Sequence, residues 1–247
     1  MNLAMQHKEA KATQEPSGAT TSVREQVAVV IAAYNEGGAI GPVVEAARAH
    51  CGYVIVVDDG SSDETLAVAS SAGAYAIRHP INLGQGAALQ TGIDFALSLG
   101  ARFVVTFDAD GQHAAEEILP MVQHLIASGS DIVLGSRFLG NTVNMPRSKA
   151  FTLWLAVRFS RLTTGLKLTD THNGFRVFSS HAAQRIRIRQ NRMAHASEIL
   201  DQIANLKLRY AEFPVTITYS DYSIAKGQRV LNSVAIVKDQ LMNRLAK

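Results

Sequence analysis

Short apolar runs alternate with longer amphipathic stretches along most of the chain. Residues 27–33, VAVVIAA, are continuously apolar and rich in β-branched side chains, as is typical of a strand buried on both faces of a sheet. Similar runs occupy residues 53–59, 103–110 and 131–137. Helical spacing is found between them, at residues 39–49, 63–72, 85–99 and 116–128. This alternation predicts an α/β fold with a mostly parallel central sheet and helices on both faces.

Three of the predicted strands end in polar sequence. YNE follows the first, DDGSSDE the second and DADGQH the third. Ligands of open α/β sheets bind outside the carboxyl ends of the strands. The acidic residues of these three segments are therefore expected to meet at one edge of the sheet and to form a binding site there.

DADGQH carries the sharpest chemical signal. Asp108 and Asp110 are two positions apart at the end of a strand, so both carboxylates can lean toward one point beyond the sheet. Hard oxygen ligands suit Mg2+ or Mn2+, which share the phosphates of a substrate, and Gln112 could add an amide oxygen. The alternative is a solvated turn, because Asp and Gly are common loop residues.

Two further segments indicate a nucleotide. Asp58 and Asp59 can accept hydrogen bonds from a nucleobase N–H and a ribose hydroxyl. In NLGQGAALQTG, Gly84 and Gly86 stand at a predicted helix N-terminus, whose N–H groups could meet a phosphate or a sugar hydroxyl. A tight turn without a ligand explains the second segment equally well.

Composition narrows the class of protein. Of the 247 residues, 47% are hydrophobic and 18% charged, which excludes global disorder. The single cysteine, Cys51, excludes a disulfide scaffold and a cysteine-built zinc site. No apolar run reaches the roughly 18 residues needed to span a bilayer. Residues 1–22 have the composition of a mobile polar tail and lack a signal-peptide pattern, so we expect a cytoplasmic protein with a single domain over residues 23–247.

Charge is divided unevenly along the chain. Residues 1–136 carry 6 basic and 15 acidic side chains, whereas residues 137–247 carry 18 and 6. This asymmetry predicts an acidic half that can bind a metal and a basic half that binds an anion or an anionic surface. The alternative is that the charges only keep two faces of the protein solvated. The basic half has few aromatic residues for base stacking, so no nucleic-acid partner is predicted.

The stretch after Arg147 has two interpretations. One helical face would carry Phe151, Leu155, Phe159 and Leu162, and another Trp154, Arg158 and Arg161. Such a helix could lie in a membrane interface near a lipid phosphate, or its apolar stripe could face the core.

Two histidines have expectations of their own. His113 could tune a metal site or simply pack in its turn. His195 is expected on a helix surface.

The order of the motifs resembles that of a known family. YNE, DDGSSDET, NLGQGAAL, DADGQH, GSR, DTHNGFR and YSIAKGQ occur as in family 2 glycosyltransferases of the dolichyl-phosphate mannose synthase type, over residues 27–227. The resemblance implies a GT-A fold, a UDP- or GDP-hexose donor, a divalent metal and inversion at the anomeric carbon. The lipid-directed branch of this family uses a polyprenyl phosphate, dolichyl or undecaprenyl, as acceptor.

The resemblance also implies roles for individual residues. Tyr34, Glu36 and Asp58 would contact the base and ribose of the donor, and Asp108, Asp110 and Gln112 would hold the metal on its diphosphate. Lys226 lies where the family supplies a basic contact to that diphosphate. Gln85 departs from the pattern, because family members often have lysine there.

On the acceptor side, Arg137 of GSR and Arg147 of MPRSK look like the arginines that bind the acceptor phosphate, and Arg176 of DTHNGFR is grouped with them. A phosphate acceptor is already largely ionised at neutral pH and needs positioning more than a strong base. A saccharide hydroxyl would need a general base, for which Asp170 is the candidate, although Asp170 could orient Arg176 instead.

Two other functions therefore remain open on sequence grounds. One is transfer to a saccharide hydroxyl on the same fold. The other is a non-catalytic nucleotide-binding module that recruits partners to a membrane, against which the two intact metal aspartates argue.

Overall fold

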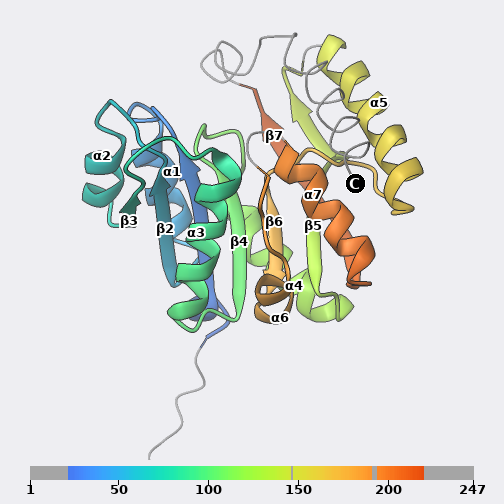
Figure 1. Cartoon of the computed structure of the whole chain (residues 1–247), viewed down its shortest axis with the longest axis horizontal. Coiled ribbons are helices and arrows are strands. Elements are labelled where there is room, and N and C mark those ends of the chain that lie inside the picture. The colour runs from blue at the N-terminus through green and yellow to red at the C-terminus, as the bar shows by residue number, and fades with distance from the viewer. Residues whose placement is uncertain (1–21, 146, 191–193, 220–247) are drawn as a thin grey trace, which may run out of the picture.

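In the computed structural model, which describes residues 22–145, 147–190 and 194–219, seven strands form one sheet at the centre of the molecule (Figure 1). Their order across the sheet is β3-β2-β1-β4-β6-β5-β7. The strands are β1 (Val27–Ala33), β2 (Tyr53–Asp58), β3 (Tyr75–Arg78), β4 (Phe103–Asp108), β5 (Ile132–Val143), β6 (Arg176–Ser179) and β7 (Tyr210–Thr218). All pairs are parallel except those of β6, which runs antiparallel between β4 and β5. The predicted mostly parallel sheet is confirmed.

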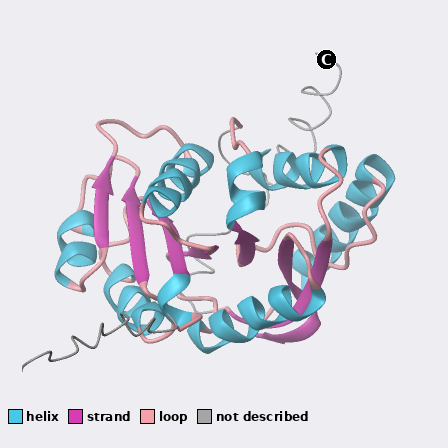
Figure 2. Cartoon of the chain, turned by 90° about the horizontal axis from the view of Figure 1, so that it is seen from below, coloured by secondary structure: helices cyan, strands magenta, loops and turns pink. Residues whose placement is uncertain are grey.

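Helices cover both faces of this sheet (Figure 2). They are α1 (Ile40–Arg48), α2 (Thr65–Ser71), α3 (Gln85–Ser98), α4 (Ile118–Ser128), α5 (Arg147–Thr164), α6 (Ser180–Arg185) and α7 (Ala194–Asn205), with short 3-10 turns at Arg24–Gln26 and Ala115–Glu117. Helices α1, α2 and α4 pack into one apolar cluster with one face of the sheet. Helices α3, α6 and α7 pack into a second cluster on the other face. The core is therefore two layers separated by the sheet.

Register brings the acidic strand ends together. Ala33 at the end of β1 pairs with Asp58 of β2, and Ala32 pairs with Asp108 of β4. The two aspartates therefore flank the last residues of β1 at one edge of the sheet, as the sequence predicts.

Strand β5 extends beyond the predicted residues 131–137. It continues to Val143 because its second half pairs with β7, after a break in register between Ser136 and Asn141. Arg137 stands at this break, directly after the last regular pair.

The apolar stripe of α5 faces outward. Phe151, Leu155 and Leu162 are 62%, 48% and 86% exposed, whereas Leu153 and Val157 point inward. The core-facing interpretation of this stripe is therefore wrong. Among the helices of the described residues, none has the length and apolar character needed to cross a membrane.

Candidate active site

Backbone N–H groups of the loop after β1 donate hydrogen bonds to side-chain hydroxyls of the segment after β2. The N–H of Asn35 donates to Oγ of Ser61 at 2.9 Å, and the N–H of Glu36 donates to Oγ1 of Thr65 at 2.8 Å. Glu36 is buried by this arrangement, while the ring of Tyr34 remains 47% exposed. These contacts hold the loop after β1 against the segment that follows the carboxyl end of β2.

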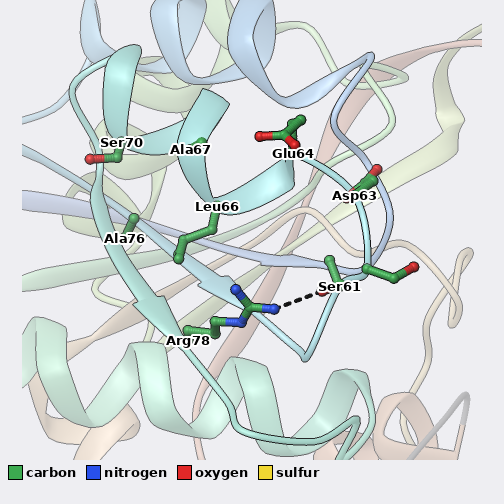
Figure 3. A pocket seen from close by; sticks show the side chains of 9 residues that line it. Ser61, Asp63, Glu64, Leu66, Ala67, Ser70, Ala76 and Arg78 are labelled. Atoms are coloured by element: carbon green, nitrogen blue, oxygen red, sulfur yellow. Dashed lines mark hydrogen bonds between the residues drawn. The ribbon is translucent and has the colours of Figure 1, made fainter.

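Asp58 is buried with one oxygen unsatisfied. Its Oδ1 accepts from the N–H of Ser61 at 2.9 Å, and its Oδ2 has no hydrogen-bond partner among the described residues. Nε of Arg78 lies 3.7 Å from that oxygen. The Arg78 guanidinium also donates to the carbonyl oxygen of Ser61 and borders a shallow hollow beside α2 (Figure 3). A buried acceptor without a partner is uncommon, and a ligand N–H or hydroxyl would satisfy it.

Asp59 is fully engaged by the protein. Its Oδ1 accepts from the N–H of Leu83 at 2.9 Å and lies 2.8 Å from Nδ1 of His79. Its Oδ2 accepts from the N–H of Gly84 at 2.7 Å. Asp59 therefore fixes the loop that leads into α3, and its predicted direct contact with a donor stays a prediction.

Glycine is required at two positions near the start of α3 for different structural reasons. Gly84 precedes the helix with φ at +97°, a conformation that side chains disfavour. Gly86 is buried, and a Cβ there would collide with the carbonyl oxygen of Gln190. The structure explains Gly86 by this close approach of another chain segment, and its predicted donor contact stays a prediction.

Asp108 is held by a histidine that packs within an aromatic cluster. Nε2 of His113 donates to Oδ2 of Asp108 at 2.8 Å, and the imidazole packs against the rings of Phe107 and Phe175, whose centroids are each 5.3 Å away. Burial alone would raise the pKa of Asp108, but the hydrogen bond and charge of His113 hold it below its ordinary value. Gly174 leaves room for this carboxylate, because a Cβ there would collide with its oxygens.

Asp110 has the opposite electrostatic environment. Burial and the nearby charge of Asp108 raise its pKa, and Glu36 adds to this effect. The side-chain amide nitrogen of Gln112 donates to Oδ2 of Asp110. Crowded carboxylates of this kind are stabilised by a cation.

The described residues contain no group of three or more His, Cys, Asp or Glu able to hold a metal by themselves. Two carboxylates fit Mg2+ or Mn2+, however, because these ions complete their shells with water and substrate phosphate. The oxygens of Asp108 and Asp110 are therefore chemically suitable ligands.

Arg137 and Asp170 form a buried ion pair. Nε of Arg137 donates to Oδ2 of Asp170 at 2.6 Å, and the backbone N–H of Arg137 donates to the same oxygen at 3.2 Å. The two Nη atoms donate to the hydroxyl of Tyr219 at 2.8 Å and to the carbonyl oxygen of His172 at 2.9 Å. Oδ1 of Asp170 accepts from the N–H of His172 at 3.2 Å. Asp170 thus orients Arg137, and no hydrogen bond joins it to Arg176 among the described contacts.

Two buried donors lie in the same motif without partners. Nη1 of Arg176 and Nδ2 of Asn173 make no hydrogen bond with the described residues. Burial lowers the pKa of Arg176 to about 10, although Asp108 and Asp170 act to raise it. Arg176 is 2% exposed. Its contact with an acceptor phosphate stays a prediction.

The remaining predicted residues lie in less defined places. Lys226 is outside the described residues, and so is the side chain of Arg147, at the first position of α5. His195 is only 4% exposed, so the expectation of a surface histidine is wrong. It lies close enough to Asp108 and His172 to influence the pKa of each.

Sequence reasoning missed Tyr219. Its hydroxyl accepts a hydrogen bond from Arg137, and the charge of Asp110 acts to raise the pKa of that hydroxyl. The backbone N–H of the neighbouring Thr218 donates to the carbonyl oxygen of Gln112. The end of β7 thus connects the two aspartates of β4 with the Arg137–Asp170 pair. The local sequence around Tyr219 contains no motif that marks a functional tyrosine. Tyr219 reaches Arg137 because β7 pairs with β5, a strand far from it in the sequence.

Residues 28–187 match the family model described as glycosyl transferase family 2. The chain belongs to this family. It is 33% identical to the UDP-N-acetylglucosamine–dolichyl-phosphate N-acetylglucosaminyltransferase of Methanococcus voltae, over 89% of this chain and 96% of that protein. It is 28% identical to the polyprenol monophosphomannose synthase of Mycolicibacterium smegmatis, over 84% and 83%.

Solved structures confirm the GT-A fold expected for a family 2 glycosyltransferase. The glucosyl-3-phosphoglycerate synthase of Mycobacterium tuberculosis, in complex with Mn2+, UDP-glucose and phosphoglyceric acid, superposes with a TM-score of 0.68. The match covers 93% of this chain and 85% of that one at 17% sequence identity. At this identity the likeness establishes the fold.

Proposed function

We propose that this family 2 glycosyltransferase transfers a hexose, with inversion, from a UDP- or GDP-sugar to a polyprenyl phosphate. The observation that carries the choice of acceptor is the engagement of Asp170. Both of its oxygens accept hydrogen bonds within the protein, and one binds Arg137. This engagement supports a role for Asp170 in positioning a phosphate-binding arginine rather than in deprotonating a hydroxyl. The names of the relatives from Methanococcus voltae and Mycolicibacterium smegmatis support the same acceptor class.

Asp108 and Asp110 would hold Mg2+ or Mn2+, with Gln112 as a further ligand. When bound, the cation neutralises charge on the departing nucleoside diphosphate. His113 keeps the carboxylate of Asp108 oriented and ionised. Tyr34, Glu36 and the unsatisfied oxygen of Asp58 would bind the base and ribose, and Lys226 the diphosphate.

The reaction needs no proton acceptor on the enzyme. An oxygen of the ionised lipid phosphate forms the bond to the anomeric carbon while the bond from that carbon to the diphosphate breaks, and the nucleoside diphosphate leaves. The planar guanidinium of Arg137, oriented by Asp170 and Tyr219, suits a phosphate because it can donate through two nitrogens. Arg147 and Arg176 would add positive charge on the acceptor side.

Nucleoside diphosphate release tests this proposal. Purified enzyme is incubated with UDP-glucose, UDP-N-acetylglucosamine or GDP-mannose, with Mn2+ or Mg2+, and with undecaprenyl phosphate, undecaprenol or a soluble oligosaccharide. We expect release that requires the lipid phosphate and disappears in Asp110→Asn. Release stimulated by the oligosaccharide instead would favour a hydroxyl acceptor, and nucleotide binding without turnover under any condition would favour a recruitment module.

We also propose that α5 rests on the inner face of a membrane, where it meets the lipid acceptor. Its outward side carries Phe151, Trp154, Leu155 and Leu162, and Phe138, Leu139 and Val143 of the extended β5 are exposed as well. The Arg158 guanidinium lies 5.3 Å from the Trp154 ring centroid, which places positive charge beside this apolar surface. Apolar side chains with adjacent arginines suit an anionic lipid interface. The enzyme would then be a peripheral protein of the cytoplasmic side, folded as one domain over residues 23–247.

Trp154 is the only tryptophan of the chain, so its fluorescence reports on this surface directly. We expect a blue shift with vesicles of anionic phospholipid at low salt, and a much weaker shift in Leu162→Glu. The matched control is Ile126→Glu, which alters an apolar residue of α4 that is 48% exposed. An unchanged spectrum of the wild-type protein with anionic vesicles would contradict the membrane proposal.

A further inference from the structure

The loop that joins α5 to β6 holds a half-buried imidazole beside the Arg137–Asp170 pair. His172 makes three contacts. Its backbone N–H donates to Oδ1 of Asp170, and its backbone carbonyl oxygen accepts from Arg137. Its ring atom Nδ1 lies 2.9 Å from Oγ1 of Thr171. Nε2 is the atom that these contacts leave uncommitted. The two backbone contacts fix the loop beside the Arg137–Asp170 pair, and the Thr171 contact sets the orientation of the ring.

The charges around His172 favour an anion. Arg137 and Arg176 both act on it electrostatically, and Asp170, the acidic group that faces it, is already bound to Arg137. The fourth group that influences it is His195 at the start of α7. Nη1 of Arg176 has no partner among the described residues, so the same region holds a second donor ready for an anion.

We propose that His172 binds the phosphate of the lipid acceptor, with the Thr171 hydroxyl donating to Nδ1 and the Nε2–H donating to a phosphate oxygen. This inference rests on the proposed function and adds a residue to its acceptor site. A neutral imidazole is suited to the task because it adds a directed donor without a further positive charge. Burial and the two arginines lower the pKa of His172 to about 4, so this donor persists unchanged across neutral pH.

Three substitutions separate the roles of the two ring nitrogens. The amide of His172→Gln reaches the position of Nε2, whereas that of His172→Asn reaches only the position of Nδ1, and His172→Ala removes both. We expect the KM for undecaprenyl phosphate to rise about tenfold or more in the Ala and Asn variants, as for the loss of a hydrogen bond to a charged group. The Gln variant should stay within a few-fold of the wild type.

The donor side provides the internal control. KM for the nucleotide sugar should be unchanged in all three variants. His181→Ala is the matched control, because His181 is on α6, its imidazole is exposed beside Asp131, and it lies outside the loop that joins α5 to β6. Inorganic phosphate should compete with the lipid phosphate, and its inhibition constant should rise in His172→Ala.

The outcomes distinguish this inference from the proposed function. No transfer to lipid phosphate by the wild-type enzyme would overturn both. Transfer by the wild type with an unchanged lipid KM in His172→Ala would overturn the role of His172 alone. A raised lipid KM with an unchanged inhibition constant for inorganic phosphate would also overturn it, because the contact would then be with the polyprenyl chain.

Discussion

Nε of Arg137 lies 2.6 Å from Oδ2 of Asp170, and the two side chains are 7% and 0% exposed. This pair joins β5 to the DTHNGFR motif 33 residues later and connects through Tyr219 to the end of β7. The pair therefore holds these three segments together, and in the proposed function it would support acceptor binding.

Asp170→Ala is expected to lower the free energy of unfolding by about 3–5 kcal/mol, because it leaves the Arg137 charge buried without its partner. Urea denaturation measures this loss. Asp94→Ala is the control, since Asp94 and Arg187 form an ion pair of similar length whose side chains are 54% and 50% exposed. That change should cost less than about 1 kcal/mol. Equal losses for both variants would argue against a supporting role for the buried pair.

Gly174→Ala should weaken metal binding, because the added methyl group would collide with the carboxylate of Asp108. Displacing a metal ligand through its neighbour reduces affinity by about 10–100-fold in other sites. Electron paramagnetic resonance of free Mn2+ in a titration with UDP present measures the affinity. Gly38→Ala has open space for its methyl group and should leave the affinity unchanged. Wild-type affinity in Gly174→Ala would show that Asp108 is not a ligand.

Mn2+ affinity should fall as the solution is acidified. The pKa of Asp110 is raised by burial and by Asp108, so protons compete for this carboxylate at a higher pH than for an ordinary aspartate. The increase in melting temperature that Mn2+ and UDP produce should therefore grow as pH rises through that raised pKa and then level off. A thermal shift that does not depend on pH in the acidic range would contradict the assignment of Asp110 as a ligand.

Acid should also destabilise the fold through His172. Its pKa is about 4 in the folded protein, against 6.5 for a free imidazole, so between these two values the unfolded chain binds more protons. Stability is fully present above pH 6.5 and is lost as the pH falls toward 4, with a slope of at most about 1.4 kcal/mol per pH unit from this group. Urea denaturation at several pH values should show a smaller slope in His172→Gln. An identical slope would contradict the depressed pKa.

Local patterns predict the first half of the fold, where the proposed donor site lies. The strands β1, β2 and β4 are continuous apolar runs that end in acidic loops, and parallel pairing brings those ends together. The juxtaposition of Asp58 and Asp108 could be anticipated for this reason, because each residue stands at the end of a strand that pairs with β1.

The acceptor half depends on contacts that no local pattern records. Strand β6 has four residues and begins at the charged Arg176, and Tyr219, directly after β7, lies 82 residues beyond Arg137. The sequence predicts a surface position for His195 at a polar helix start, yet the residue is only 4% exposed in the fold. The α5 stripe has core-like spacing but faces outward, because the side of the helix that packs inward carries Leu153 and Val157.

The most direct test of the account is the mass of the lipid product. Enzyme, Mn2+, the active nucleotide sugar and undecaprenyl phosphate are incubated, and the organic phase is analysed by mass spectrometry. We predict a species heavier than undecaprenyl phosphate by one sugar residue, absent with undecaprenol and absent in Asp110→Asn. Consumption of the donor with the sugar recovered only as free sugar or on an oligosaccharide, and none on the lipid phosphate, would contradict the assignment of a phosphate acceptor.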